Sequence, residues 1–218
     1  RIEGLGFPIV KANGMISRGV TIKYRSESYY GNLAGVEEEY MEFGNVEVES
    51  GRFFTNNAVE RGQMVGVIGH KVYIELFGEG REALGKEIDV SGRQVTVIGV
   101  LKEKGGSIGG GSGDDNTYLL MPVTAASKVT GIKKPAAIMV RTENADGISL
   151  ATRKIKDYFY RKDLTDDDFT ILEPKELLES INSFLGVVTG ALSGIAAISL
   201  VVGGIGIANI MLVSVTER

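Results

Sequence analysis

The pattern of apolar and charged positions divides this chain into two unlike parts at Glu179. Before that residue, short apolar stretches alternate with charged and glycine-rich ones, which is typical of short strands and helices. After it, the 37 residues 180–216 contain no Asp, Glu, Lys, Arg or His, and aliphatic and small residues dominate. A helix needs about 20 apolar residues to cross a membrane. The run therefore predicts one long membrane helix that follows a water-exposed α+β domain.

Strand and helix signals alternate through the first part. The stretch up to about Glu49 is β-rich, and strands at 87–90 and 94–101 flank Ser91-Gly92, a pair of residues that favours a hairpin. Further strands are expected at 63–69, 117–121, 136–141 and 169–172, and a turn is expected at 51–57. One helix is expected at 71–77, ended by Gly78, and a second from Pro122 to Gly131. A third begins at a cap, Asn144 or Asp146, and its apolar face consists of Ile148, Ala151, Ile155 and Phe159.

The last helix is predicted to begin at Glu173-Pro174, because proline loses no hydrogen bond at a first helical position. The charge-free run is longer than one span, so we expect Pro174 to about Gly186 to form a stalk outside the bilayer. A strand is excluded, since it could not satisfy its backbone in lipid. The alternative is a buried hairpin of core helices, against which the length argues. The stalk residues are Pro174, Leu177, Leu178 and Ile181.

Small residues mark one side of the predicted membrane helix. Gly186, Gly190 and Gly194 recur every four residues, so they line one face on which another helix can approach closely. The alternative is that glycine is simply frequent in membrane helices. We predict that helix packing also uses Gly203, Gly204 and the polar Asn209, which should face protein rather than lipid.

Composition removes several classes of function. The formal net charge is −4, and the 24 basic residues are scattered among 28 acidic ones, so no basic stripe is present for nucleic acid. The chain has no cysteine and one histidine, His70, which leaves little scope for thiolate or imidazole metal sites. We interpret His70 as a surface or capping residue.

The glycine-rich stretch 105–116 predicts a mobile loop, because it cannot bury enough apolar area to offset the entropy of ordering it. Within it, Gly105 to Gly109 matches the G-x-S-x-G pattern with Ser107 as the nucleophile. That pattern requires a strand-to-helix turn and a later histidine, and the sequence predicts neither. No Gly-Lys-Ser/Thr follows to bind a phosphate. A hydrolase or nucleotide site is therefore not expected.

Three acidic groups have the ligand type that a hard cation such as Ca²⁺ prefers. Their spacing fits no standard calcium loop, so we interpret them as solvated acidic turns. The sequence therefore predicts no catalytic, cofactor-binding or metal-binding residues. The three groups are Asp114-Asp115, Asp163 with Asp166 to Asp168, and Glu37 to Glu39.

Two segments resemble the permeases of MacB-type ABC transporters, a family related to FtsX-like proteins. Residues 195–218, which include Gly203-Gly-Ile-Gly-Ile-Ala-Asn209, are similar to the second membrane helix of these permeases. A series of motifs, in order, is similar to their periplasmic core domain: Gly51-Arg-Phe-Phe-Thr, Val65-Gly-Val-Ile-Gly, Glu75-Leu-Phe-Gly, Gly85-Lys-Glu-Ile, Val95-Thr-Val-Ile-Gly-Val-Leu and Tyr118-Leu-Leu-Met-Pro.

The resemblance implies a two-lobed extracytoplasmic domain, in which a porter-like α/β lobe carries an inserted β-rich lobe, followed by one long stalk and transmembrane helix. The first membrane helix, and the opening strand and helix of the porter-like lobe, are expected to precede this sequence. The expected segments are 1–50 and 131–178 for the porter-like lobe, 51–130 for the inserted lobe, and 179–218 for the stalk and membrane helix.

The resemblance also implies a function: a non-catalytic part of an ATP-driven export permease in the cell (inner, cytoplasmic) membrane, with residues 1 to about 180 outside the cytoplasm. Its implied partners are a second copy or a related permease subunit, a cytoplasmic ATPase that holds the ATP, membrane lipid, and an adaptor or an exported peptide, lipoprotein or small molecule. The alternative is an FtsX-like signalling permease that regulates an extracellular cell-wall hydrolase without transporting substrate.

Overall fold

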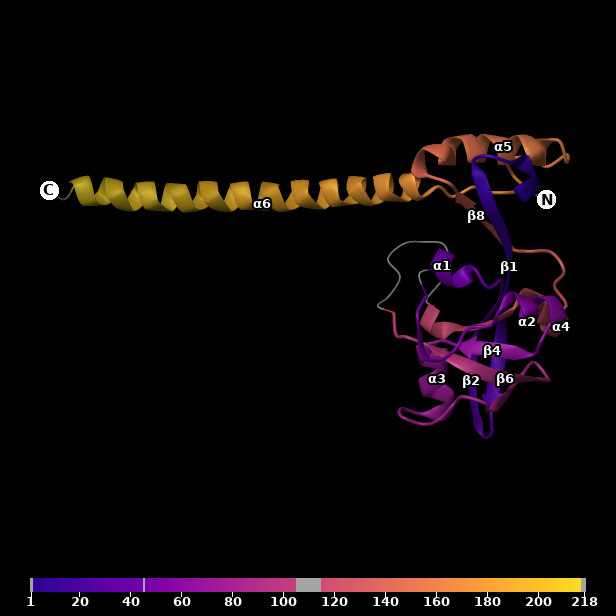
Figure 1. Ribbon diagram of the computed structural model, residues 1–218. Helices are drawn as coiled ribbons and strands as arrows, with labels where there is room; N and C mark the ends of the chain where they lie inside the picture. Colours follow the sequence, from indigo (N-terminus) through magenta and orange to yellow (C-terminus); the bar gives the residue numbers. More distant parts are fainter. Residues whose placement is uncertain (1, 45, 105–114, 217–218) are drawn as a thin grey trace. The chain divides into compact units, whose positions relative to one another are not determined.

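The computed structural model describes residues 2–44, 46–104 and 115–216 and divides the chain into two units, residues 1–169 and residues 170–218 (Figure 1). The strands are β1 (Ile9–Tyr24), β2 (Glu27–Val36), β3 (Val48–Gly51), β4 (Val65–Ile68), β5 (Glu87–Val90), β6 (Arg93–Leu101), β7 (Tyr118–Pro122) and β8 (Ala137–Thr142). The helices are η1 (Ile2–Leu5), α1 (Tyr40–Gly44), α2 (Asn56–Arg61), α3 (His70–Phe77), η2 (Asp115–Thr117), α4 (Val123–Thr130), η3 (Ala145–Gly147), α5 (Ile148–Tyr160) and α6 (Pro174–Thr216).

Six strands of the first unit pair in a closed ring. Their order is β2-β7-β4-β6-β5-β1, and β1 pairs again with β2, so the path returns to its start. The pairs β2–β7 and β4–β6 are parallel, and the others in the ring are antiparallel. β3 adds to β6, and β8 adds to β1. Closing the path leaves few unpaired strand edges, a common solution for β-rich domains.

Strands β4 and β7 and the second half of β2 are largely buried on both sides, because each side is covered there. Successive side chains of a strand point to opposite faces, and in β2 Leu33 packs with one buried cluster while Ala34 packs with the other. The first cluster includes α3 and α4 through Val72, Leu76 and Ala125. The second includes α1 and α2 through Tyr40 and Ala58.

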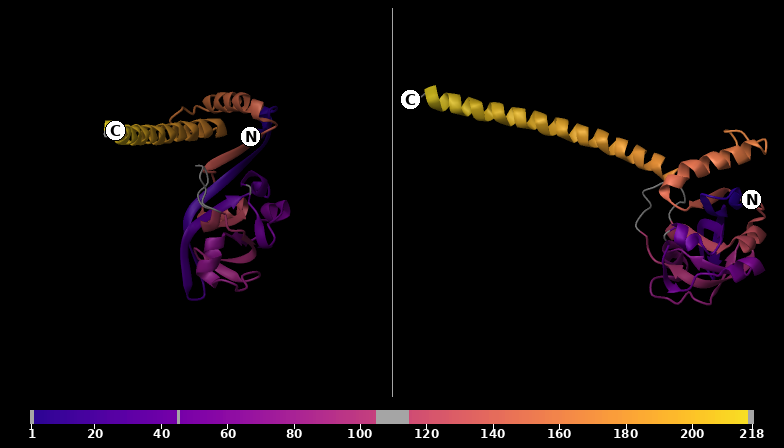
Figure 2. Two further views of the ribbon diagram at one scale, coloured as in Figure 1. Left: turned by 90° about the vertical axis from the view of Figure 1, so that its left-hand side faces the viewer. Right: turned by 45° about the horizontal axis from the view of Figure 1, so that its top comes forward.

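β1 is long enough to serve two ladders in succession (Figure 2). Its first part, Ile9–Met15, pairs with β8, and its second part, Ile16–Tyr24, pairs with β2. We call the first pairing the β1–β8 ladder. The change of partner between Met15 and Ile16 is where this ladder joins the ring. The predicted division into segments 1–50, 51–130, 131–178 and 179–218 stays a prediction.

The hairpin predicted at Ser91-Gly92 is confirmed. β5 and β6 pair in antiparallel fashion with Val90 opposite Arg93, and both turn residues have positive φ, 54° at Ser91 and 84° at Gly92. Such a two-residue turn matches the twist of the flanking strands. The helix ends predicted at Gly78 and Gly131 are also confirmed, since these residues follow α3 and α4.

Several local predictions need correction. No strand forms at 169–172, because Phe169 packs its ring on Phe159 of α5, at 4.7 Å between centroids, instead of joining a sheet. Helix α2 begins inside the turn expected at 51–57. Pro122 ends β7 and precedes α4 rather than opening the helix. Residues 105–114 of the expected glycine loop lie outside the described residues, whereas its last part belongs to η2.

The second unit contains one uninterrupted helix, α6, which begins at Pro174 as predicted and continues to Thr216 (Figures 1 and 2). Its 43 residues correspond to about 65 Å at 1.5 Å per residue. The α+β composition of the first unit and this long apolar helix confirm the predicted fold class.

Candidate functional site

The segment Ile181–Ala208 of α6 is long and apolar enough to cross a membrane. It has 28 residues, and its most apolar stretch has no buried residue. At 1.5 Å per residue it is about 42 Å long, against about 30 Å of hydrocarbon. Large side chains are exposed along it, among them Ile198 at 67 % and Leu200 at 78 %. An exposed apolar surface of this length is costly in water and stable in lipid.

The residues predicted to pack this helix against another stand on an open surface. A Cβ added at Gly186, Gly190, Gly194, Gly203 or Gly204 would meet nothing within 4 Å apart from its own stretch of helix, so a partner helix could approach these positions. Their role in packing stays a prediction. Asn209 and the stalk residues Pro174, Leu177 and Leu178 lie in α6, but their side chains are outside the described part of the chain, and Ile181 is partly exposed.

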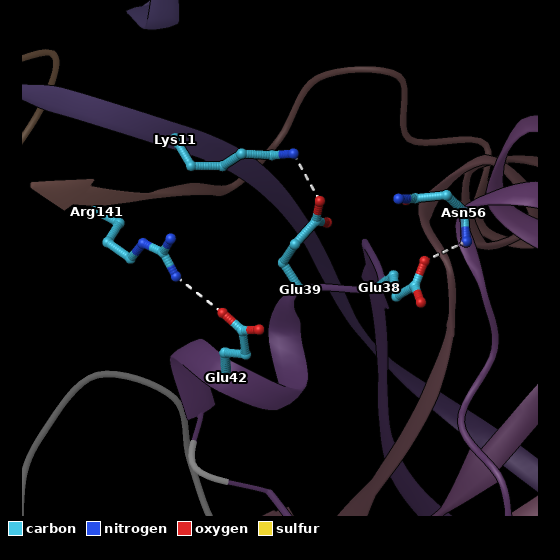
Figure 3. A network of polar contacts seen from close by, with 6 residues as sticks. All are labelled: Lys11, Glu38, Glu39, Glu42, Asn56 and Arg141. Carbon is cyan, nitrogen blue, oxygen red and sulfur yellow. Dashed lines mark hydrogen bonds and ion pairs between the residues drawn. The ribbon is translucent and has the colours of Figure 1, made fainter. Parts of the chain in front are cut away.

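A set of ion pairs connects the β1–β8 ladder to the segment that follows β2 (Figure 3). Lys11 on β1 donates to Glu39 with Nζ 2.6 Å from Oε1. Arg141 on β8 donates to Glu42 of α1 with a nitrogen 2.8 Å from Oε2. Lys11 and Arg141 are opposite one another in the strand register. Both cations therefore belong to the ladder, and both carboxylates belong to residues 37–44.

The same acidic segment, residues 37–44, also binds the N-terminus of α2. The backbone N–H of Asn56, the first residue of α2, donates to Glu38 Oε2 at 2.6 Å (Figure 3). Negative charge is favourable at a helix N-terminus. The Lys11 ammonium lowers the pKa of Glu39, since it bonds the charged carboxylate. The prediction of a solvated acidic turn is therefore wrong for Glu39, whose Oε2 is buried.

Sequence reasoning missed Lys11 and Arg141. One signal was present, because three consecutive glutamates just after a buried strand need partners if the chain folds over them. The partners are 28 residues away for Glu39 and 99 residues away for Glu42, and only the pairing of β1 with β8 brings the two cations together. No local pattern records such a separation.

Hydrogen bonds connect Lys104 and Asn116, which lie at the two ends of the glycine-rich stretch. The side-chain oxygen of Asn116 accepts from the Lys104 N–H at 3.0 Å, and its side-chain nitrogen donates to the Lys104 carbonyl at 2.7 Å. Lys104 Nζ lies 3.1 Å from Asp115 Oδ2, and Tyr40 donates to Asp115. Ser107 and Asp114 lie outside the described residues, so neither the G-x-S-x-G motif nor the Asp114-Asp115 pair can be assembled into a site.

The remaining acidic candidates make local contacts. Asp168 accepts from the backbone and hydroxyl of Thr165, which lowers its pKa, and Asp166 accepts from Tyr160. His70 begins α3 after the N-cap Gly69, with Nδ1 3.7 Å from a Glu49 oxygen, too long for a hydrogen bond. Within residues 2–44, 46–104 and 115–216, no three His, Asp or Glu side chains are grouped to hold a metal ion.

A cleft of about 550 Å³ lies beside the β1–β8 ladder. Its lining includes aromatic side chains from α5 and an aliphatic side chain from β8. It also includes one charged residue from β1 and one from residues 37–44. The lining residues are Ile2, Lys11, Ala12, Gly14, Glu37, Pro135, Ile138, Tyr158 and Phe159. The cleft and the ion pairs therefore occupy the same junction.

Comparison with known proteins places the chain in a family. Residues 1–158 match the family of the MacB-like periplasmic core domain, and the chain belongs to this family. Over 93 % of its length it is 32 % identical to the uncharacterized ABC transporter permease YknZ of Bacillus subtilis. Over 96 % it is 35 % identical to the macrolide export ATP-binding/permease protein MacB of Neisseria meningitidis serogroup A. The chain spans 50 % of the first relative and 32 % of the second.

Solved structures agree with this assignment. The extracellular domain of the noncanonic ABC-type transporter YknZ from Gram-positive bacteria matches 72 % of this chain and 81 % of its own with a TM-score of 0.60 and 28 % identity. The periplasmic region of MacB from Actinobacillus actinomycetemcomitans matches 81 % of this chain and 78 % of its own with a TM-score of 0.68 and 18 % identity, which shows the shared fold. The chain therefore combines a MacB-like periplasmic core domain with one candidate membrane helix.

Proposed function

We propose that this chain is the extracytoplasmic domain and second membrane helix of an ATP-driven export permease in the cytoplasmic membrane. One observation carries the proposal: α6 is a single helix of 43 residues that contains an exposed apolar segment of 28, and it follows a MacB-like core domain after residue 158. A continuous helix transmits displacement along its axis as a packed rigid element.

In this proposal the chain does no covalent chemistry. ATP is bound and hydrolysed by a separate ATPase domain or subunit in the cytoplasm, and residues 1 to about 180 stand outside it. The chain pairs with a second copy or a related permease subunit through the glycine face at Gly186, Gly190 and Gly194. The domain contacts cargo or an adaptor, and α6 links that contact to the ATPase. The open surface at the three glycines supports such pairing.

A cross-linking experiment tests the coupling. In the full-length permease, reconstituted with its ATPase in liposomes, Gly190→Cys places a thiol on the predicted contact face. Leu192→Cys is the matched control, because two residues turn the helix by about 200° and place the thiol on the far side. We expect Gly190→Cys copies to cross-link and ATP hydrolysis to fall, with restoration by reductant. Cross-linked copies that hydrolyse ATP at the normal rate would contradict the proposal.

Purification of partners separates export from signalling. Recovery of an adaptor, lipoprotein or peptide that changes ATP hydrolysis supports export. Recovery of a cell-wall hydrolase, with ATP hydrolysis independent of any exported molecule, would instead establish the FtsX-like regulatory function.

A further inference from the structure

The β1–β8 ladder is attached to the ring by few covalent connections. Two lie in the described part of the first unit: the continuous strand β1, which changes partners between Met15 and Ile16, and residues 131–136, which lead from α4 to β8. A strand and a short connection can bend as a hinge far more easily than a packed sheet can shear.

Across this junction the side-chain contacts sort by charge. Lys11 and Arg141 lie on the ladder, and Glu39 and Glu42 lie on the segment 37–44 that packs with the ring. In these two pairs both cations are on the ladder side of the joint and both carboxylates are on the other side. Separating the two sides breaks both pairs together.

The strength of these pairs suits a joint that opens. Side-chain exposure is 40 % for Lys11, 23 % for Glu39, 51 % for Arg141 and 71 % for Glu42. The Arg141–Glu42 pair is exposed and the Lys11–Glu39 pair is part-buried. With the strength typical of ion pairs that water still reaches, each favours the closed arrangement by a factor of about 1.5 to 5. Two of them together bias the joint strongly enough to set its resting position, yet weakly enough for a driven movement to reverse it.

The interior of the joint contains a buried polar side chain beside its apolar contacts. Asn13 is 2 % exposed, and neither its amide oxygen nor its amide nitrogen has a hydrogen-bond partner among the described residues. It lies between Lys11 and Met15 on β1, two residues from each, so its side chain points to the same face, where Met15 packs with Tyr40. Buried polar atoms without partners are costly when the joint is closed, and water can satisfy them when it opens.

We propose that the Lys11–Glu39 and Arg141–Glu42 pairs form a releasable clasp that holds the β1–β8 ladder closed against residues 37–44, and that the ladder swings from the ring when the clasp opens. The clasp rests on the proposed function, because an ATP-driven permease needs a movable joint in its ectodomain. In this proposal the joint lies between the ladder and the ring. Displacement of α6 moves the ladder and α5, while the ring stays rigid.

Distance measurements between two spin labels test the clasp in the full-length permease in lipid nanodiscs. Exposed positions carry the labels, Ser149→Cys on α5 and Lys71→Cys on α3, in a background without other cysteines. We expect Lys11→Glu to lower the ratio of closed to open distances by about 2- to 25-fold, because the attraction is lost and a repulsion of similar size from Glu39 replaces it. The exchanged pair Lys11→Glu with Glu39→Lys should restore the wild-type distribution.

The control is an exposed ion pair of similar length. Lys102 and Glu47 are 2.7 Å apart, but Lys102 follows β6 of the ring and Glu47 precedes β3, which pairs with β6, so Lys102→Glu leaves the label distances unchanged if the clasp is specific. Wild-type distances for Lys11→Glu, or an open distribution in the exchanged pair, would overturn the proposal. ATP hydrolysis by the same samples tests the proposed function separately, since the clasp distances are measured without nucleotide.

Discussion

The apolar helix should be intolerant of charge at its middle and tolerant of charge at its predicted stalk. Ile198 lies well inside the segment Ile181–Ala208, and Ile181 is 17 residues earlier, about 25 Å along the axis. Half of the hydrocarbon thickness is only about 15 Å. If Ile198 lies near the bilayer centre, Ile181 therefore lies outside the hydrocarbon.

The expected magnitude follows from these depths. A lysine at the centre of a membrane helix costs about 2.5–3.5 kcal/mol for insertion, whereas isoleucine contributes about −0.3 to −0.6 kcal/mol. Ile198→Lys should therefore disfavour insertion by about 3–4 kcal/mol, more than about 100-fold in the equilibrium. Ile181→Lys should cost well under about 1 kcal/mol, because its ammonium reaches water.

Both variants are compared in a membrane-insertion assay, with residues 174–218 placed in a reporter protein. Because the wild-type segment is strongly apolar, serines are added in a common background until insertion is incomplete, so that a loss is visible. Equal insertion of Ile198→Lys and wild type would refute the reasoning, because the helix would then not lie in hydrocarbon. An equally large loss for Ile181→Lys would show that the stalk begins elsewhere.

Three further predictions concern the folded domain, each measured as a free energy of unfolding by denaturant titration. Gly35→Ala should destabilise by about 1–3 kcal/mol, since its Cβ would clash with that of Ala126. The double variant with Ala126→Gly should lose less stability than the sum of the two single losses, and additive losses would contradict this contact. Leu33→Ala, at 0 % exposure, should cost about 2–5 kcal/mol, and a loss below about 1 kcal/mol would mean that the site is not core. Because Lys11 lowers the pKa of Glu39, the native carboxylate is less easily protonated than the unfolded one. Glu39→Gln should thus lose up to about 1 kcal/mol of stability at pH 6, and this difference should vanish as the pH falls through the lowered pKa of Glu39. A difference that persists at the lower pH would contradict the ion pair.

Local signals in the sequence predicted most of the elements. The Ser91-Gly92 hairpin, the helix ends at Gly78 and Gly131, and the start of α6 at Pro174 depend on the backbone preferences of a few neighbouring residues. Phe169 shows the limit of such signals. Its alternating apolar neighbours have the pattern of a strand, but its ring contacts α5, and a period of two does not identify the partner.

The candidate membrane helix could be predicted from the sequence because it depends on one property of one segment: a run of consecutive apolar residues too long to be stable in water. The junction beside β1 was not. Whether Glu39 is a solvated charge or half of a clasp depends on which strands pair, and strand pairing is set by contacts between residues far apart in the chain. Composition and periodicity therefore predicted which part of the chain faces water and which faces lipid. Only the tertiary structure determined which charged side chains form pairs.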